Sequence, residues 1–194
     1  MYLCVRFLEV NKIVYVDESG LNREYQNVFA RAKRGVKIYD TKSGKRQKRT
    51  NIIAGLMCNI SDKTLKTENE GYLAVQCYEH STTSAFFEDW FEFELIPLLP
   101  KDVSVVMDNA AFHNKKRLWK IAERYEINLL FLPPYSPEMN PIEQIWKEIR
   151  KEGFKNEFFN TLDDVVVRLS ETICKLTRET IKSITGRDWI LEIF

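Results

Sequence analysis

The sequence lacks the features that would place it outside ordinary globular proteins. Its 4 cysteines are scattered without a CxxC pair and it has only 2 histidines, so neither a disulfide framework nor a zinc site is expected. Its 7 glycines and 6 prolines are too few for a fibrous or low-complexity chain. No apolar run approaches the ~20 residues of a membrane span, and the charged start of the chain is a poor signal peptide. We therefore expect no membrane partner and a reducing, cytoplasmic location.

The charge is balanced overall, with 29 Lys+Arg against 28 Asp+Glu and a net charge of +1. This excludes a uniformly acidic or basic binder and leaves room for a local basic patch. A length of 194 residues with 44% hydrophobic residues fits one compact domain.

Short β-rich runs occupy the first half of the chain and then alternate with helical patterns. Strands are expected at 13–16, 51–58, 72–77, 103–107 and 128–132. Helices are expected at 84–95 with Ser84 as cap, 115–125, 140–151 and 161–176. This order predicts an α/β domain in which a mixed sheet carries helices on its faces.

Two aspartates, Asp17 and Asp108, are expected to end buried strands. Ligand sites in open α/β sheets gather at the carboxyl ends of strands. If the two strands are adjacent, the carboxylates repel each other unless they are protonated or share a partner such as Mg²⁺. Taken singly, each aspartate is also an ordinary strand-end turn residue.

A third acid, Glu143, stands near the start of the predicted helix 140–151. Asn140 is expected as the N-cap, with Pro141 at the first helical position and Glu143 at the third. Glu143 is therefore either part of a capping box or, because it borders the apolar stripe of this helix, a ligand that points along the sheet. Trp146 lies on that stripe and is expected in the core rather than on DNA.

The combination of motifs closely resembles a known family. Val106–Ala110 (VMDNA) with His113, and Leu132–Trp146 (LPPYSPEMNPIEQIW), are similar to the catalytic core of the mariner superfamily of DDE transposases, above all its prokaryotic insertion-sequence branch. Val14–Ser19 (VYVDES) matches the first motif of that family, and 34 residues separate the second acid from the third, as in that branch. The resemblance covers about residues 12–155.

The resemblance implies an RNase H-like fold, a five-strand mixed sheet flanked by helices, over residues 13–155. Residues 1–12 would form an N-terminal extension, and 156–194 a C-terminal helical segment packed on the domain. Asp17, Asp108 and Glu143 carry over as catalytic, metal-binding acids that hold two Mg²⁺ or Mn²⁺ ions.

Several residues near the three acids could either support the site or have an ordinary structural role. Asn109 and His113 match the family pattern; His113 contacts phosphate, braces Asp108, or is a helix-start histidine satisfied by backbone. Glu18 should point to the opposite face of its strand and is excluded as a ligand. Tyr135 is expected to pack on the proline loop rather than stack on a base.

The implied activity is metal-dependent cleavage of DNA phosphodiester bonds at transposon ends, followed by strand transfer to target DNA. Two alternatives stay open. One is an idle transposase remnant that binds DNA or protein, and the other is an RNase H-type hydrolase of RNA–DNA hybrids, which lacks the proline-rich block.

Segment 31–50 carries nine positive charges against one negative charge, with a turn signal at Ser43-Gly44. We interpret it as a hairpin whose basic tip contacts the phosphate backbone of double-stranded DNA, from both transposon ends and target. The candidate contacts are Arg31, Lys33, Arg34, Lys45, Arg46, Lys48 and Arg49.

The sequence departs from the family at its start, since about a dozen residues precede the first predicted strand. The helix-turn-helix region that reads transposon ends is therefore expected on a separate or frameshift-fused polypeptide, or is absent. Active family members usually work as dimers, so a homodimer is an open alternative. A DNA-acting protein of this kind would be associated with the nucleoid.

Overall fold

The computed structural model describes residues 13–23, 32–37, 39, 49–57, 71–155 and 157–185. Five strands form one sheet: β1 (Ile13–Asn22), β2 (Arg49–Met57), β3 (Tyr72–Tyr78), β4 (Ser104–Met107) and β5 (Asn128–Phe131). Their order is β3-β2-β1-β4-β5. The first three strands pair antiparallel, and β1, β4 and β5 pair parallel. The predicted five-strand mixed sheet is confirmed.

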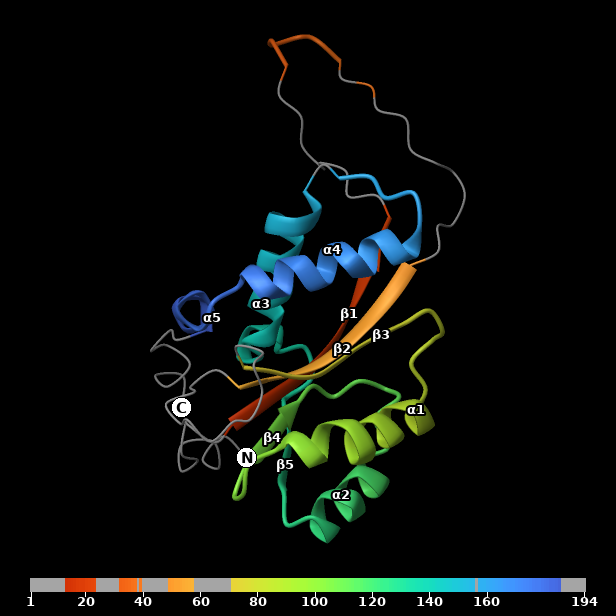
Figure 1. Ribbon diagram of the computed structural model, residues 1–194, viewed down its shortest axis with the longest axis vertical. Coiled ribbons are helices and arrows are strands. Elements are labelled where there is room, and N and C mark those ends of the chain that lie inside the picture. Colours follow the sequence, from red (N-terminus) through yellow and green to blue (C-terminus); the bar gives the residue numbers. More distant parts are fainter. Residues whose placement is uncertain are drawn as a thin grey trace.

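Helices cover both faces of this sheet (Figure 1). They are α1 (Ser84–Asp89), α2 (Lys115–Arg124), α3 (Ile142–Ile149), α4 (Leu162–Lys175) and α5 (Arg178–Thr185). Two of them continue as π-helix, α1 over Trp90–Leu95 and α3 over Arg150–Phe154. One face of the sheet packs against α3, α4 and α5, and the other against α1 and α2.

Alternation along β1 separates the two cores. Ile13 and Tyr15 belong to the core shared with α3, α4 and α5, whereas Val14 and Val16 belong to the core shared with α1 and α2. Successive side chains of a strand point to opposite faces, so Asp17 continues the first row and Glu18 the second. The predicted opposite orientation of Glu18 is thereby confirmed.

The prediction that Asp17 ends its strand is wrong, because β1 continues to Asn22. The strand outlasts its parallel partner: β4 pairs with β1 only as far as Val16, while β2 pairs with β1 as far as Asn22. Hydrogen bonds from β2 therefore keep β1 extended beyond Asp17.

Two predicted helix caps are also wrong. Thr83, not Ser84, caps α1, and its hydroxyl accepts from the backbone N–H of Phe86 at 3.3 Å. The Asn140 side chain does not cap α3. Its amide donates to the Val16 carbonyl at 3.2 Å, and its own oxygen has no hydrogen-bond partner among the described residues. The Asn140 side chain, which the local pattern predicts as the helix cap, thus makes a tertiary hydrogen bond to β1 instead.

The C-terminal helices extend the core on the α3 side. A capping box between Thr161 and Asp164 starts α4. Val165 and Leu169 of α4 and Ile181 of α5 are buried in the core that includes α3. Over the residues that the structure describes, no helix is long and apolar enough to cross a membrane. The extension 1–12 lies outside the described residues, and the division at 155/156 stays a prediction.

Candidate active site

Strand register brings the first two predicted acids together. Val16 of β1 lies opposite Met107 of β4 in a parallel pair. Asp17 is the next residue on β1, and Asp108 is the first residue after β4. The two aspartates therefore lie side by side at the same level of the sheet, although 90 residues separate them in the chain.

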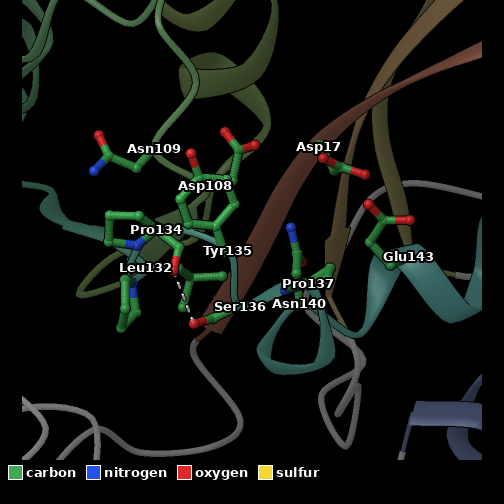
Figure 2. A pocket seen from close by; sticks show the side chains of 11 residues that line it. Asp17, Asp108, Asn109, Leu132, Pro134, Tyr135, Ser136, Pro137, Asn140 and Glu143 are labelled. Atoms are coloured by element: carbon green, nitrogen blue, oxygen red, sulfur yellow. Dashed lines mark hydrogen bonds between the residues drawn. The ribbon is translucent and has the colours of Figure 1, made fainter.

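The third acid reaches the same place from α3. The apolar stripe of this helix is buried against the sheet, and consists of Ile142, Ile145, Trp146 and Ile149. Glu143 lies in the first helical turn beside the stripe. It lines a pocket of about 390 Å³ together with Asp17, Asp108 and Asn109, and Figure 2 shows these side chains around it.

Asp17 is the most buried of the three acids. Only 6% of the residue is exposed. Burial raises the pKa of its carboxyl well above the usual value, and the negative charges of Glu143, Glu18 and Asp108 raise that pKa further. Trp146 partly opposes this rise because its indole N–H donates to Asp17 Oδ2 at 2.9 Å. Trp146 is thus buried as predicted and also holds the first acid in place.

The donor set fits a divalent cation. Three carboxylates meet in one pocket, and none of the described residues that line it is a lysine or an arginine. Hard cations such as Mg²⁺ and Mn²⁺ prefer oxygen ligands and accept one or two carboxylates each. A bound cation would offset the repulsion that raises the pKa of Asp17.

A proline-rich loop forms the rim of the pocket. It includes Pro133, Pro134 and Pro137, and Asn140 fastens its end to β1 next to Asp17. Tyr135, at the tip, has a left-handed backbone with φ 59° and is 101% exposed. The expectation that Tyr135 packs on the loop is wrong, because the whole residue is exposed to solvent.

His113 lies behind Asp108 rather than in the open pocket. Its Nδ1 is 3.2 Å from the Asp108 carbonyl oxygen and 3.5 Å from Asp108 Oδ1. Its Nε2 is 3.6 Å from Glu18 Oε1. The hydrogen bond to the Asp108 carbonyl fits the interpretation of His113 as a histidine satisfied by nearby backbone, and the 3.5 Å approach to Asp108 Oδ1 fits bracing of that acid. The link to Glu18 was missed, because it depends on how residues 109–114 fold back and leaves no local signal in the sequence.

The basic candidates are only partly described. Lys33, Arg34 and Arg49 are exposed and do not line the pocket. The strands on either side of this segment, β1 and β2, form the predicted antiparallel pair. The remaining candidates and the predicted turn lie outside the described residues: Arg31, Lys45, Arg46, Lys48 and Ser43-Gly44.

The model of the family described as "DDE superfamily endonuclease" matches residues 12–166, a range that contains all three acids. The chain belongs to this family. A curated relative, the uncharacterized protein y4pE/y4sA of Sinorhizobium fredii (strain NBRC 101917 / NGR234), is 36% identical over 87 residues, which cover 44% of this chain and 62% of that protein.

Solved structures of a mariner transposase share the fold of this DDE endonuclease domain. The Mos1 mariner paired end complex with Mn superposes with a TM-score of 0.76 at 15% identity, covering 99% of this chain and 56% of that chain. The catalytic domain of Mos1 mariner transposase gives a TM-score of 0.67 at 14% identity, covering 98% and 84%. The likeness confirms the RNase H-like fold. This chain spans little more than half of the Mos1 chain in the paired end complex.

Proposed function

We propose that this DDE endonuclease domain is the catalytic domain of a transposase. It would cleave DNA phosphodiester bonds at transposon ends and join the freed 3′ end to target DNA, with two Mg²⁺ or Mn²⁺ ions. The observation that carries the proposal is the convergence of Asp17, Asp108 and Glu143 in one pocket, with no lysine or arginine among the described residues that line it.

The residues divide the work by position. Asp17, Asp108 and Glu143 would hold the divalent ions, and Asp17 is close enough to both other acids for their charges to raise its pKa. Bound divalent ions lower the pKa of an attacking water or 3′-hydroxyl and stabilise the leaving oxygen. The protein positions these groups and needs no covalent nucleophile. Trp146 and Asn140 keep β1 and α3 in the required relation.

DNA would approach across the proline-rich rim. Tyr135 projects from that rim into solvent, where an aromatic ring can stack on a base or a sugar. The basic segment between β1 and β2 would add contacts to phosphates, with Lys33, Arg34 and Arg49 exposed as such contacts require. Such contacts position DNA without reading its sequence.

The proposed partners complete this picture. They are double-stranded DNA of transposon ends and target, a helix-turn-helix part on a separate or frameshift-fused polypeptide, and a second copy of this chain. Work on chromosomal DNA would place the protein in the cytoplasm at the nucleoid.

Nicking of supercoiled plasmid in Mn²⁺ tests the activity. The unmodified chain should convert supercoiled DNA to the open circle, and Asp108→Ala should abolish this while its circular dichroism spectrum stays native, since Asp108 follows β4 and is partly exposed. Asp89→Asn, which alters an exposed aspartate on α1, is the matched control and should nick normally. Full nicking by Asp108→Ala would refute the assignment. A folded chain that binds DNA but never nicks would instead be an idle remnant.

A further inference from the structure

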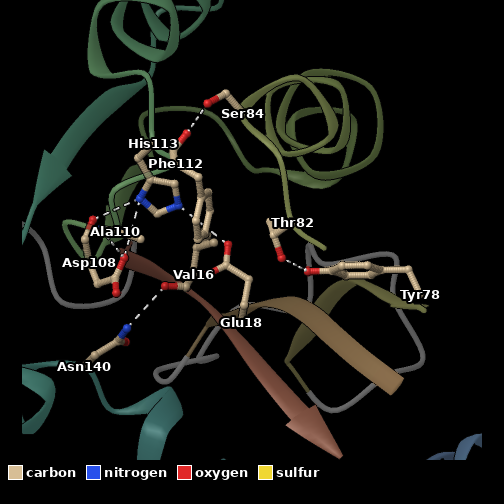
Figure 3. Close-up of polar contacts among 10 residues, drawn as sticks. All are labelled: Val16, Glu18, Tyr78, Thr82, Ser84, Asp108, Ala110, Phe112, His113 and Asn140. Carbon is tan, nitrogen blue, oxygen red and sulfur yellow. Dashed lines mark hydrogen bonds and ion pairs between the residues drawn. The ribbon is translucent and has the colours of Figure 1, made fainter. Parts of the chain in front are cut away.

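A line of three side chains, two of them largely buried, connects β1 with the loop that carries the second acid. Figure 3 shows His113 between Glu18 and Asp108. The His113 side chain is 1% exposed and that of Glu18 is 15% exposed, whereas the Asp108 side chain is 47% exposed. The acid that faces the pocket is thus the least confined member of the line.

The two ring nitrogens of His113 face oxygen atoms on opposite sides. Nδ1 lies 3.2 Å from the Asp108 carbonyl, and Nε2 lies 3.6 Å from Glu18 Oε1. Nε2 and Glu18 Oε1 are buried and face each other, and neither has a hydrogen-bond partner among the described residues. Turning the ring would leave one or both of these atoms without a neighbour, at a considerable cost for buried polar groups.

Three aromatic side chains also pack around the His113 ring. The His113 ring centroid is 4.3 Å from that of Phe87, 4.5 Å from that of Phe112 and 6.2 Å from that of Phe131. These rings come from α1, the loop before α2, and β5. The imidazole is therefore a rigid support rather than a side chain free to reach a substrate.

The support acts on one oxygen of Asp108. Oδ1 accepts from the Ala110 N–H at 3.0 Å and lies 3.5 Å from His113 Nδ1. In the described part of the chain, Oδ2 has no such contact, so it is the oxygen left to bind a cation. Because Glu18 directly follows Asp17 on β1, the line also ties the orientation of Asp108 to the strand that carries the first acid.

We propose that His113 and Glu18 are positioning residues, which hold the Asp108 carboxylate in the orientation that binds a divalent cation together with Asp17. This inference rests on the proposed function. Groups that orient metal ligands from behind typically change metal affinity by 10- to 100-fold when they are removed. Glu18 would act only through His113.

The test measures Mn²⁺ affinity of the full chain by calorimetry and by electron paramagnetic resonance of free Mn²⁺, without DNA. His113→Ala and Glu18→Ala should each weaken Mn²⁺ binding by about tenfold or more. Glu18→Gln keeps an oxygen that can accept from the ring and should retain most of the affinity. Glu18→Ala should add little in the His113→Ala background, since residues that act as one unit are not additive.

Glu88→Ala is the matched control. Glu88 is a buried glutamate on α1 that pairs with Arg117 and does not line the pocket. Its loss should lower the melting temperature and leave Mn²⁺ affinity unchanged. If the Glu18 and His113 variants bind Mn²⁺ as Glu88→Ala does, the positioning role is wrong. If Asp108→Ala also binds normally, the proposed function itself fails.

If the alanine variants do not fold, a measurement on the unmodified chain still tests the proposed positioning role. It has only two histidines, and His80, which contacts Ser81 and neighbouring rings, is the internal reference. Saturating Mg²⁺ should shift the ring resonances of His113 in nuclear magnetic resonance spectra and leave those of His80 in place. An unmoved His113 at saturation would overturn the proposal.

Discussion

Replacing Asp17 by asparagine should stabilise the metal-free protein and abolish metal binding. Burial and three neighbouring carboxylates raise the pKa of Asp17 well above its usual value. Asparagine removes the charge but keeps an oxygen that can accept from Trp146 Nε1. The variant thus loses the desolvation and repulsion and retains the hydrogen-bond geometry.

The sign of the pH dependence follows from that raised pKa. The folded protein binds the Asp17 proton more tightly than the unfolded chain, so folding is favoured at low pH. Stability is lost as pH rises from the ordinary aspartate range near about 4 toward the folded pKa. Within that window one proton changes the free energy of unfolding by about 1.4 kcal/mol per pH unit. A change of 1 kcal/mol moves the melting temperature of a chain this size by about 2–4 °C.

Thermal unfolding in EDTA between pH 4.5 and 7.5 measures the effect. Asp17→Asn should melt higher than the unmodified chain at pH 7.5, by a few degrees for each kcal/mol, and the gap should narrow toward pH 4.5. Some pH dependence should persist in the variant, because burial also raises the pKa of Glu18. Asp89→Asn, at an exposed position, should melt at the same temperature as the unmodified chain throughout this pH range.

Excess Mg²⁺ should reverse the order of the two melting temperatures, so that the unmodified chain melts higher than Asp17→Asn. Only the chain that binds the ion gains stability from mass action. The reasoning is refuted if Asp17→Asn is the less stable protein in EDTA at pH 7.5, or if the gap does not depend on pH.

Two further predictions concern the support of Asp17 and the approach of DNA. Trp146→Phe keeps a buried ring but removes the donor to Asp17. It should lower the free energy of unfolding in urea by about 1.5–3 kcal/mol and weaken Mn²⁺ binding. The control Trp90→Phe, which loses a donor to a backbone carbonyl in the other core, should lower the free energy of unfolding without changing Mn²⁺ affinity. An unchanged Mn²⁺ affinity in Trp146→Phe would contradict the role of the indole. Neutralising Arg46, Lys48 and Arg49 together should reduce the slope of log K against log salt for duplex DNA by about 3, at roughly 0.9 per phosphate contact; an unaltered slope would exclude these contacts.

Local patterns were sufficient for most of the elements. The apolar run of β1 and the 3.6-residue stripe of α3 are properties of short segments, and both were correctly predicted to be buried. Element ends were less predictable. Asp17 lies inside β1 because β2 continues the pairing, and Asn140 bonds to Val16 instead of capping α3. Both outcomes depend on a partner that is distant in the chain.

The same distinction applies to the site. The spacing from Asp108 to Glu143 and the proline-rich block between them indicated the family from the sequence, because motif residues are adjacent along the chain. Tyr135 was expected to pack on the proline loop, but it is fully exposed, and its backbone is left-handed. A backbone conformation of this kind is set by the whole loop.

The sequence by itself determined which residues are chemically able to hold a divalent ion, which short segments are apolar enough to be buried strands, and where the apolar stripe of α3 lies. The tertiary structure decided that Asp17 and Asp108 leave neighbouring strands at one level, and that Glu18 meets His113 behind them. The physical reason is that side-chain alternation is fixed within a segment. Strand register and loop return are fixed by hydrogen bonds and packing between segments that only folding brings together.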